Sequence, residues 1–421
     1  MQLTAHTRQI DRSAWSEAGT VKEVALLLAV LLATAAFFGL LFDKETALSY
    51  SIGYNLYGAR RILGGETPYK DFHTLYPPAT VYLNAAIFRL LGISLYNALL
   101  GVFIFKVLTT AALYLGGRMI MPRAWALLVA ASSLLWLRPN GPFKAVPMHY
   151  GALFLAATLL LVLSYLRDRR RATLIAAGLA LGILALFKHN IGAYALAGAL
   201  LVILPERGKG AFKPASIFRN YREALILAIG FIIPVLLVVI LMAYRGALGP
   251  MARTLLFGPG DFLLSRLAGW PSPVGFLIFA LALAGAVMLG FKWRAGAKMK
   301  GLAWLILLAC CLFVILSGQG INDSLIFYAP VGVILWGLTA TLAEFKRGEE
   351  DWRVSLAVLV VAASAFLEAF PRFAREQAVA SMPFVTLLLL YQIRRSYRFV
   401  IRLTGADNGR DFSRMASAAA L

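Results

Sequence analysis

Long apolar blocks constrain this chain more than any other feature. Blocks of about 20 residues with few charges recur along it, such as VALLLAVLLATAAFFGLLF (24–42) and ALILAIGFIIPVLLVVILMAY (224–244). A helix of that length rises 1.5 Å per residue and therefore crosses a hydrocarbon core about 30 Å thick. Only 14% of the residues are charged and 60% are hydrophobic, whereas roughly 25% are charged in typical soluble domains. The sequence predicts an all-α polytopic membrane protein.

The positions of Lys and Arg predict how the chain is threaded through the membrane. The net charge is +21, and the basic residues cluster in short loops such as RDRRR (167–171), where they orient a membrane protein. The charge therefore indicates topology and not nucleic-acid binding. All dense basic clusters fall on the cytoplasmic side if both termini are cytoplasmic and PATVYLNAAIFRLLG (78–92) is a juxtamembrane helix instead of a span. We predict about 12 transmembrane helices, near 23–42, 96–116, 124–137, 150–166, 172–188, 191–204, 223–244, 273–291, 301–317, 325–344, 354–371 and 380–393.

The same reading divides the chain into three parts. Residues 1–22 form a cytoplasmic N-terminal segment, 23–403 form an integral-membrane domain, and 404–421 form a cytoplasmic tail. No small-residue cleavage site follows the first apolar block, so we expect that block to remain as an anchor. The first extracytoplasmic loop is 43–95, and polar, proline- and glycine-rich sequence concentrates on its side of the membrane. We therefore expect the protein to act on that side.

The first loop contains a concentrated polar stretch, GGETPYKDFHTLYPP (64–78). Apolar residues at helical spacing precede it and stop at Gly64 and Gly65, which predicts a surface helix before the stretch. A second surface helix, 78–92, follows. Two surface helices flanking a proline-stiffened turn would hold Asp71 near the bilayer boundary, where a carboxylate can take a proton from a hydroxyl. The alternative is that Asp71 and Lys70 are solvated turn residues.

Two ionisable residues lie within apolar sequence. Lys188 ends an otherwise apolar helix, and a charge at membrane depth is costly unless it faces a cavity or a partner. Glu368, within AFLEAFPRF, is predicted to pair with Arg372 one turn further on. The two cysteines, Cys310 and Cys311, are adjacent in an apolar run, so they indicate neither a disulfide framework nor a metal site.

Two segments and the general topology are similar to those of a known family. The segments are ARRILGGETPYKDFHTLYPPATVYLNAAIFRLLG (59–92) and LSYLRDRRRATLIAAGLALGILALFKHNIGAYAL (163–196). In organisation the chain resembles the integral-membrane glycosyltransferases of the GT-C fold. These enzymes use polyprenyl-phosphate sugars and include protein O-mannosyltransferases, aminoarabinose transferases and bacterial envelope glycosyltransferases. The resemblance implies a GT-C-like membrane fold with juxtamembrane helices in the first periplasmic loop.

The resemblance also implies an activity. The chain would transfer a sugar from a polyprenyl-phosphate donor to an envelope glycan, lipid or protein, by inverting single displacement. The reaction would take place on the extracytoplasmic face of a bacterial-type inner membrane. Asp71 would be the general base. This chain has Ser51 where these enzymes usually carry an acidic pair, so either Asp71 acts alone or Asp43 fills that role.

The expected substrate-binding residues lie in or near the extracytoplasmic loops. Lys188 is the first candidate for the donor phosphate, followed by Arg253 and Arg266, because a cation stabilises the negative charge that the leaving phosphate gains. The full predicted set is Lys188, Arg253, His73, Arg266, Tyr69, Tyr76, Glu66 and Lys70. We expect no cofactor, no metal ligands and no nucleic-acid partner; dependence on a divalent cation stays open. Membrane lipid is the expected surrounding partner.

Two other functions fit the same sequence. A transporter or flippase of lipid-linked glycans would suit about 12 spans, although transporters commonly show two matching halves and the polar loop here occurs once. An envelope-polysaccharide polymerase or ligase would use a later loop, for which 245–272 is the candidate. The sequence does not predict the sugar, the acceptor or the length of the polyprenyl tail.

Overall fold

A computed structural model describes residues 17–42, 50–136, 145–203, 214–256, 321–349, 351–369 and 375–404. These ranges are almost entirely helical, and no β-strand occurs within them. The helices are α1 (Glu17–Phe42), α2 (Tyr50–Leu63), α3 (Ala79–Leu91), α4 (Leu95–Ile120), α5 (Arg123–Trp136), α6 (Pro147–Asp168), α7 (Arg171–Phe187), α8 (His189–Ile203), α9 (Pro214–Tyr244), α10 (Leu248–Leu256), α14 (Ile321–Arg347), α15 (Trp352–Phe366), the short 3₁₀-helix η2 (Leu367–Ala369) and α16 (Arg375–Thr404).

Five of the described helices contain a segment long and apolar enough to cross a membrane. They are α1, α4, α6, α9 and α14. Five shorter apolar helices accompany them: α3, α5, α7, α8 and α15. Each predicted span other than 273–291 and 301–317 overlaps a described helix, and the helical class is confirmed. The total of about 12 spans is not confirmed, since the predicted spans 273–291 and 301–317 lie outside the described residues.

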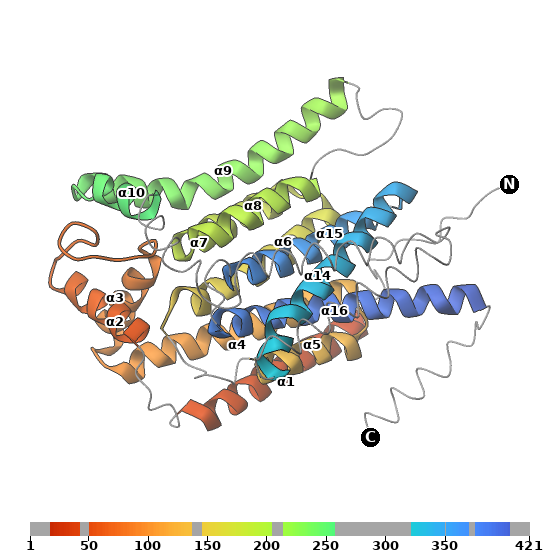
Figure 1. Cartoon of the computed structure of the whole chain (residues 1–421), viewed down its shortest axis with the longest axis horizontal. Helices are drawn as coiled ribbons and strands as arrows, with labels where there is room; N and C mark the ends of the chain where they lie inside the picture. The colour runs from red at the N-terminus through yellow and green to blue at the C-terminus, as the bar shows by residue number, and fades with distance from the viewer. Residues whose placement is uncertain are drawn as a thin grey trace.

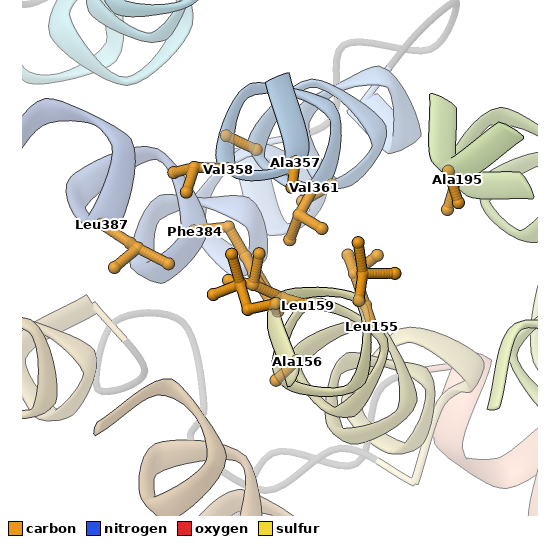
Figure 2. Close-up of a cluster of buried hydrophobic side chains, with 14 of the residues drawn as sticks. Leu155, Ala156, Leu159, Ala195, Ala357, Val358, Val361, Phe384 and Leu387 are labelled. Atoms are coloured by element: carbon orange, nitrogen blue, oxygen red, sulfur yellow. The ribbon is translucent and has the colours of Figure 1, made fainter. Parts of the chain in front are cut away.

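Helix α6 lies at the centre of the largest buried cluster. Figure 2 shows Leu155 and Leu159 of α6 directed toward Val361 of α15 and Phe384 of α16, with Ala195 of α8 nearby. Lipid tails are as apolar as these side chains, so transmembrane helices associate through close packing instead of hydrophobic exclusion from water. The close fit of these helices fixes the ends of α7, α8 and α15, which carry the site described below.

Helices α7 and α9 pack particularly closely because small residues line their contact. A Cβ atom at Gly178 would overlap the backbone carbonyl oxygen of Leu227, and one at Gly182 would overlap that of Phe231. Small residues at such positions let two helix backbones approach in a membrane. The opposite face of α9 exposes large apolar side chains such as Leu236, which is 50% exposed. This face is suited to contact with lipid.

The first loop forms one end of the bundle, which we call the loop end. Helices α2, α3 and α10 lie together there (Figure 1). The two predicted surface helices are present as α2 and α3, and α2 stops at Gly64 and Gly65, where Gly65 has a φ of 89°. Helix α10 was not expected, because 245–272 was predicted as a loop.

The basic residues of the short connections lie at the opposite end. Helix α4 leaves the loop end and finishes near Arg118, and α5 starts at Arg123. The α6–α7 hairpin turns through Arg169 and Arg170, and α14 ends at Arg347. The hairpins with short basic connections therefore turn at the end that lacks the first loop.

Candidate functional site

Arg61 at the end of α2 organises the polar stretch that follows. Its guanidinium donates to Glu66 Oε2 at 2.6 Å and to the carbonyl oxygen of Asp71 at 2.8 Å. It also lies over the Phe72 ring, 5.1 Å from the ring centroid, which is within range for a cation–π contact. The hydrogen bonds to Glu66 raise the pKa of Arg61 above its usual value. The predicted substrate residue Glu66 is therefore held by an ion pair with the preceding helix, α2.

Asp71 closes a tight turn. Its Oδ2 accepts a hydrogen bond from the Thr67 backbone N–H at 2.7 Å, and its own N–H donates to the Thr67 carbonyl at 2.9 Å. Within the turn, Tyr69 has a φ of 69° and donates its N–H to the Phe72 carbonyl at 2.8 Å. The Asp71 side chain is exposed. The local sequence thus fixes the backbone of Asp71 while its side chain stays accessible.

Tyr69 connects this turn to the next part of the loop and to α9 and α10. Its hydroxyl donates to the Tyr76 carbonyl at 2.7 Å, and its ring packs beside Met242 and Met251. Burial raises the pKa of Tyr69 above its ordinary value. The phenol therefore stays protonated at neutral pH and remains a hydrogen-bond donor that holds Tyr76 in place.

Lys188 lies at the junction of α7 and α8, where the backbone is extended (φ −150°, ψ 100°). It is 7% exposed, and its Nζ forms an ion pair with Glu368 Oε1. The same ammonium lies 5.7 Å from the centroid of the Tyr76 ring. Lys188 is therefore the point at which the first loop, the α7–α8 junction and the end of α15 meet.

Among the described residues, the ion-pair partner of Glu368 is Lys188, which the sequence did not predict. Helix α15 ends at Phe366, and Glu368 follows in the short 3₁₀-helix η2. Arg372 itself lies outside the described residues. The ion pair that the structure gives Glu368 is with Lys188, 180 residues away in the chain.

Three further predicted residues lie at the same end and are exposed. Lys70 Nζ lies 3.5 Å from the Arg245 carbonyl, just after α9. The His73 carbonyl accepts from the Tyr54 hydroxyl at 2.7 Å. Arg253 is on α10. Lys70 and His73 share the first loop, whereas no contact in the described chain joins Arg253 to Lys188.

Two predicted residues lie outside the described part of the chain. They are Asp43, the alternative base, and Arg266, a candidate for the phosphate. Their roles stay predictions. Among the described residues, no group of three His, Cys, Asp or Glu side chains could hold a metal ion.

A buried polar contact between α3 and α6 was not predicted from the sequence. Asn84 of α3 is fully buried, accepts from the Tyr150 hydroxyl at 2.8 Å and donates to the Thr80 carbonyl at 2.9 Å. The Tyr150 ring stacks on Phe187, the residue before Lys188, with centroids 5.8 Å apart. A single asparagine in the apolar helix ATVYLNAAIFRLL was the available signal. This contact anchors the second surface helix beside the Lys188 junction.

Neither a protein-family model nor a curated protein sequence matches the chain. It is similar to solved structures of an oligosaccharyltransferase from Archaeoglobus fulgidus. The crystal structure tethered to an acceptor peptide by a disulfide bond is 15% identical, with a TM-score of 0.43 over 97% of this chain and 54% of that one. The apo form is 15% identical, with a TM-score of 0.42 over 97% and 55%. This chain thus spans about half the length of the solved chains, and with TM-scores this low we base no function on the likeness.

Proposed function

We propose that this chain is a GT-C-type glycosyltransferase that moves a sugar from a polyprenyl-phosphate donor to an envelope acceptor. The observation that carries the proposal is the position of Lys188. A buried ammonium at the end of two apolar helices is costly to maintain, and here it touches the loop whose sequence resembles the family's first periplasmic loop. Such a cation is suited to a lipid phosphate that approaches from the membrane.

Lys188 would act on the leaving group. As the bond between the anomeric carbon and the phosphate oxygen breaks, the phosphate gains negative charge, and a cation already fixed at that place stabilises it without reorganisation. The ion pair with Glu368 and the Tyr76 ring hold the ammonium before the donor arrives. Arg253, on α10 at the loop end, is a further candidate for the phosphate of a bound donor.

Asp71 would activate the acceptor. In a single displacement the carboxylate takes the proton of the acceptor hydroxyl, the hydroxyl oxygen bonds to the anomeric carbon, and the bond to the phosphate breaks with inversion. The rigid turn and the exposed side chain of Asp71 fit a base that meets an acceptor from outside the membrane. Asp43 stays the alternative base or a partner of Asp71.

The proposed orientation places the loop end on the extracytoplasmic side. Basic residues favour the cytoplasmic side of spanning helices, and Arg118, Arg123 and the 167–171 cluster lie at the end opposite the first loop. A bacterial-type inner membrane, where polyprenyl-phosphate sugars serve envelope synthesis, is the proposed location.

The polyprenyl tail would lie along the outside of the helices. The cavity between α6, α8 and α15, lined by Leu159, Ala195 and Val361, has a volume of about 10 Å³. That is room for about one water molecule and not for an isoprene chain. Exposed apolar residues on α8, such as Tyr194 and Leu201, give the tail a surface beyond the site.

A transfer assay tests the proposal. Purified protein in lipid nanodiscs is given a panel of radiolabelled polyprenyl-phosphate sugars with membrane extract as acceptor. We expect transfer by the wild type, and its loss in Asp71→Asn or Asp43→Asn with retained folding names the base. Full activity in both variants would contradict the mechanism, and no transfer from any lipid-linked donor would contradict the function.

A further inference from the structure

Three buried oxygen atoms on η2 and on two helices that contact it lack a hydrogen-bond donor in the described part of the chain. They are Glu368 Oε2, Asn190 Oδ1 and Gln377 Oε1. The Glu368 side chain is only 3% exposed, although its Oε1 is paired with Lys188. Asn190 follows Lys188 by two residues in the first turn of α8, and Gln377 lies in the first turn of α16. Both helices pack against η2, which carries Glu368.

Buried oxygen atoms such as these require hydrogen-bond donors. Folded proteins pair nearly all of their buried polar atoms, and each one left unpaired costs about 1–3 kcal/mol. Other such atoms occur in the described chain, but these three come from η2 and from two helices that contact it, an arrangement that suits donors brought by a ligand. Within the described residues, the hydrogen bonding of this group is therefore incomplete.

The chemistry of the three groups selects the ligand. Lys188 already neutralises Glu368, so a second cation would meet the charge of Lys188 and is disfavoured. A carboxylate oxygen only accepts hydrogen bonds, whereas an amide can present either its oxygen or its nitrogen. A hydroxyl both donates and accepts, so it satisfies all three side chains. A neutral group with several hydroxyls, which is the chemistry of a sugar, fits best.

We propose that Glu368, Asn190 and Gln377 form a sugar-binding subsite next to the phosphate held by Lys188. This inference rests on the proposed function and assigns the glycosyl part of the donor to named residues. Glu368 uses Oε1 to hold Lys188 and Oε2 to accept from a sugar hydroxyl. Because a site built to bond a hydroxyl rejects analogues that lack it, these residues determine which sugars the protein accepts.

The test compares the binding of two kinds of lipid to the full chain in nanodiscs. The first kind is bare polyprenyl phosphate. The second is a panel of sugar-bearing lipids: polyprenyl-phosphate hexoses, acetamido-hexoses and pentoses. Asn190→Leu and Gln377→Leu should each bind the preferred sugar-bearing lipid about tenfold more weakly, as expected for one lost hydrogen bond. Both variants should bind the bare lipid as the wild type does. Their thermal midpoints should stay equal or rise, because an unpaired buried oxygen has been removed.

Gln392→Leu is the matched control. Gln392 is also on α16, is 1% exposed and has a buried Nε2 without a partner in the described chain, but it lies near the basic end. This change should leave both affinities unaltered. A purely structural role for Asn190 and Gln377 predicts a lower thermal midpoint and equal losses for both lipids, and that result would overturn the subsite.

The outcomes separate the subsite from the proposed function. If the wild type prefers a sugar-bearing lipid and the Asn190 and Gln377 variants keep the full preference, the subsite is wrong while the proposed function stands. If the wild type binds neither bare nor sugar-bearing lipid, both are wrong. A loss of preference confined to these two variants supports the subsite.

Discussion

Replacing Lys188 with methionine tests whether its ion pair with Glu368 is buried and specific. The two side chains are 9% and 3% exposed, so the methionine variant leaves a carboxylate away from water. Breaking a buried pair by removing one partner costs about 3–5 kcal/mol, whereas replacing both partners with apolar residues is often close to neutral. We therefore expect Lys188→Met to lose about 3 kcal/mol and the double variant Lys188→Met/Glu368→Leu to recover to within about 1 kcal/mol of the wild type.

The assay is thermal denaturation of the protein in nanodiscs. At roughly 2 °C per kcal/mol for a large domain, the single variant should fall by about 6 °C and the double variant by about 2 °C or less. Glu368→Leu alone completes the double-mutant cycle. A loss in the double variant equal to the sum of the two single-variant losses would show that the residues do not interact, and would refute both the pair and the reasoning from its burial. Neither variant that lacks Lys188 should transfer sugar.

Three further changes test other parts of the structure. Asp71→Asn should lower the transfer rate about 100-fold or more if Asp71 is the base, while the thermal midpoint stays unchanged because an amide oxygen still accepts from the Thr67 N–H; normal transfer would exclude this role. Tyr69→Phe should lower the stability by about 1 kcal/mol, measured by thermal denaturation, because the buried hydroxyl that bonds the Tyr76 carbonyl is lost; an unchanged midpoint would mean that the bond does not form. Gly178→Val should reduce the yield of folded, monodisperse protein on size-exclusion chromatography, because its side chain overlaps the backbone of α9; a normal yield would contradict the close α7–α9 contact.

Much of the helical fold could be predicted because its signals are local. Apolar blocks gave the positions of the helices, and Gly64 and Gly65 marked the end of α2. Helix α10 was missed because it is short and contains Gly249 and Pro250, which are turn signals, although its apolar residues lie at helical spacing. The number of spans was a count of hydropathic blocks, and hydropathy alone does not tell a crossing helix from a short helix buried in the bundle.

The site could be predicted only in part. Lys188 was identified because an ionisable residue in apolar sequence requires a partner. Its partner was not, because Glu368 is distant in the chain and local spacing favoured Arg372. The contact between Lys188 and Tyr76 and the unpaired oxygens of Asn190 and Gln377 likewise depend on how separate elements pack. No local pattern encodes such contacts.

An experimental structure of the full chain with a bound polyprenyl-phosphate sugar analogue tests the central claim most directly. The account predicts a phosphate oxygen about 3 Å from Lys188 Nζ, at the end of the bundle formed by α2, α3 and α10. A phosphate bound at the opposite, arginine-rich end, with Lys188 still buried against Glu368 and remote from the lipid, would contradict it.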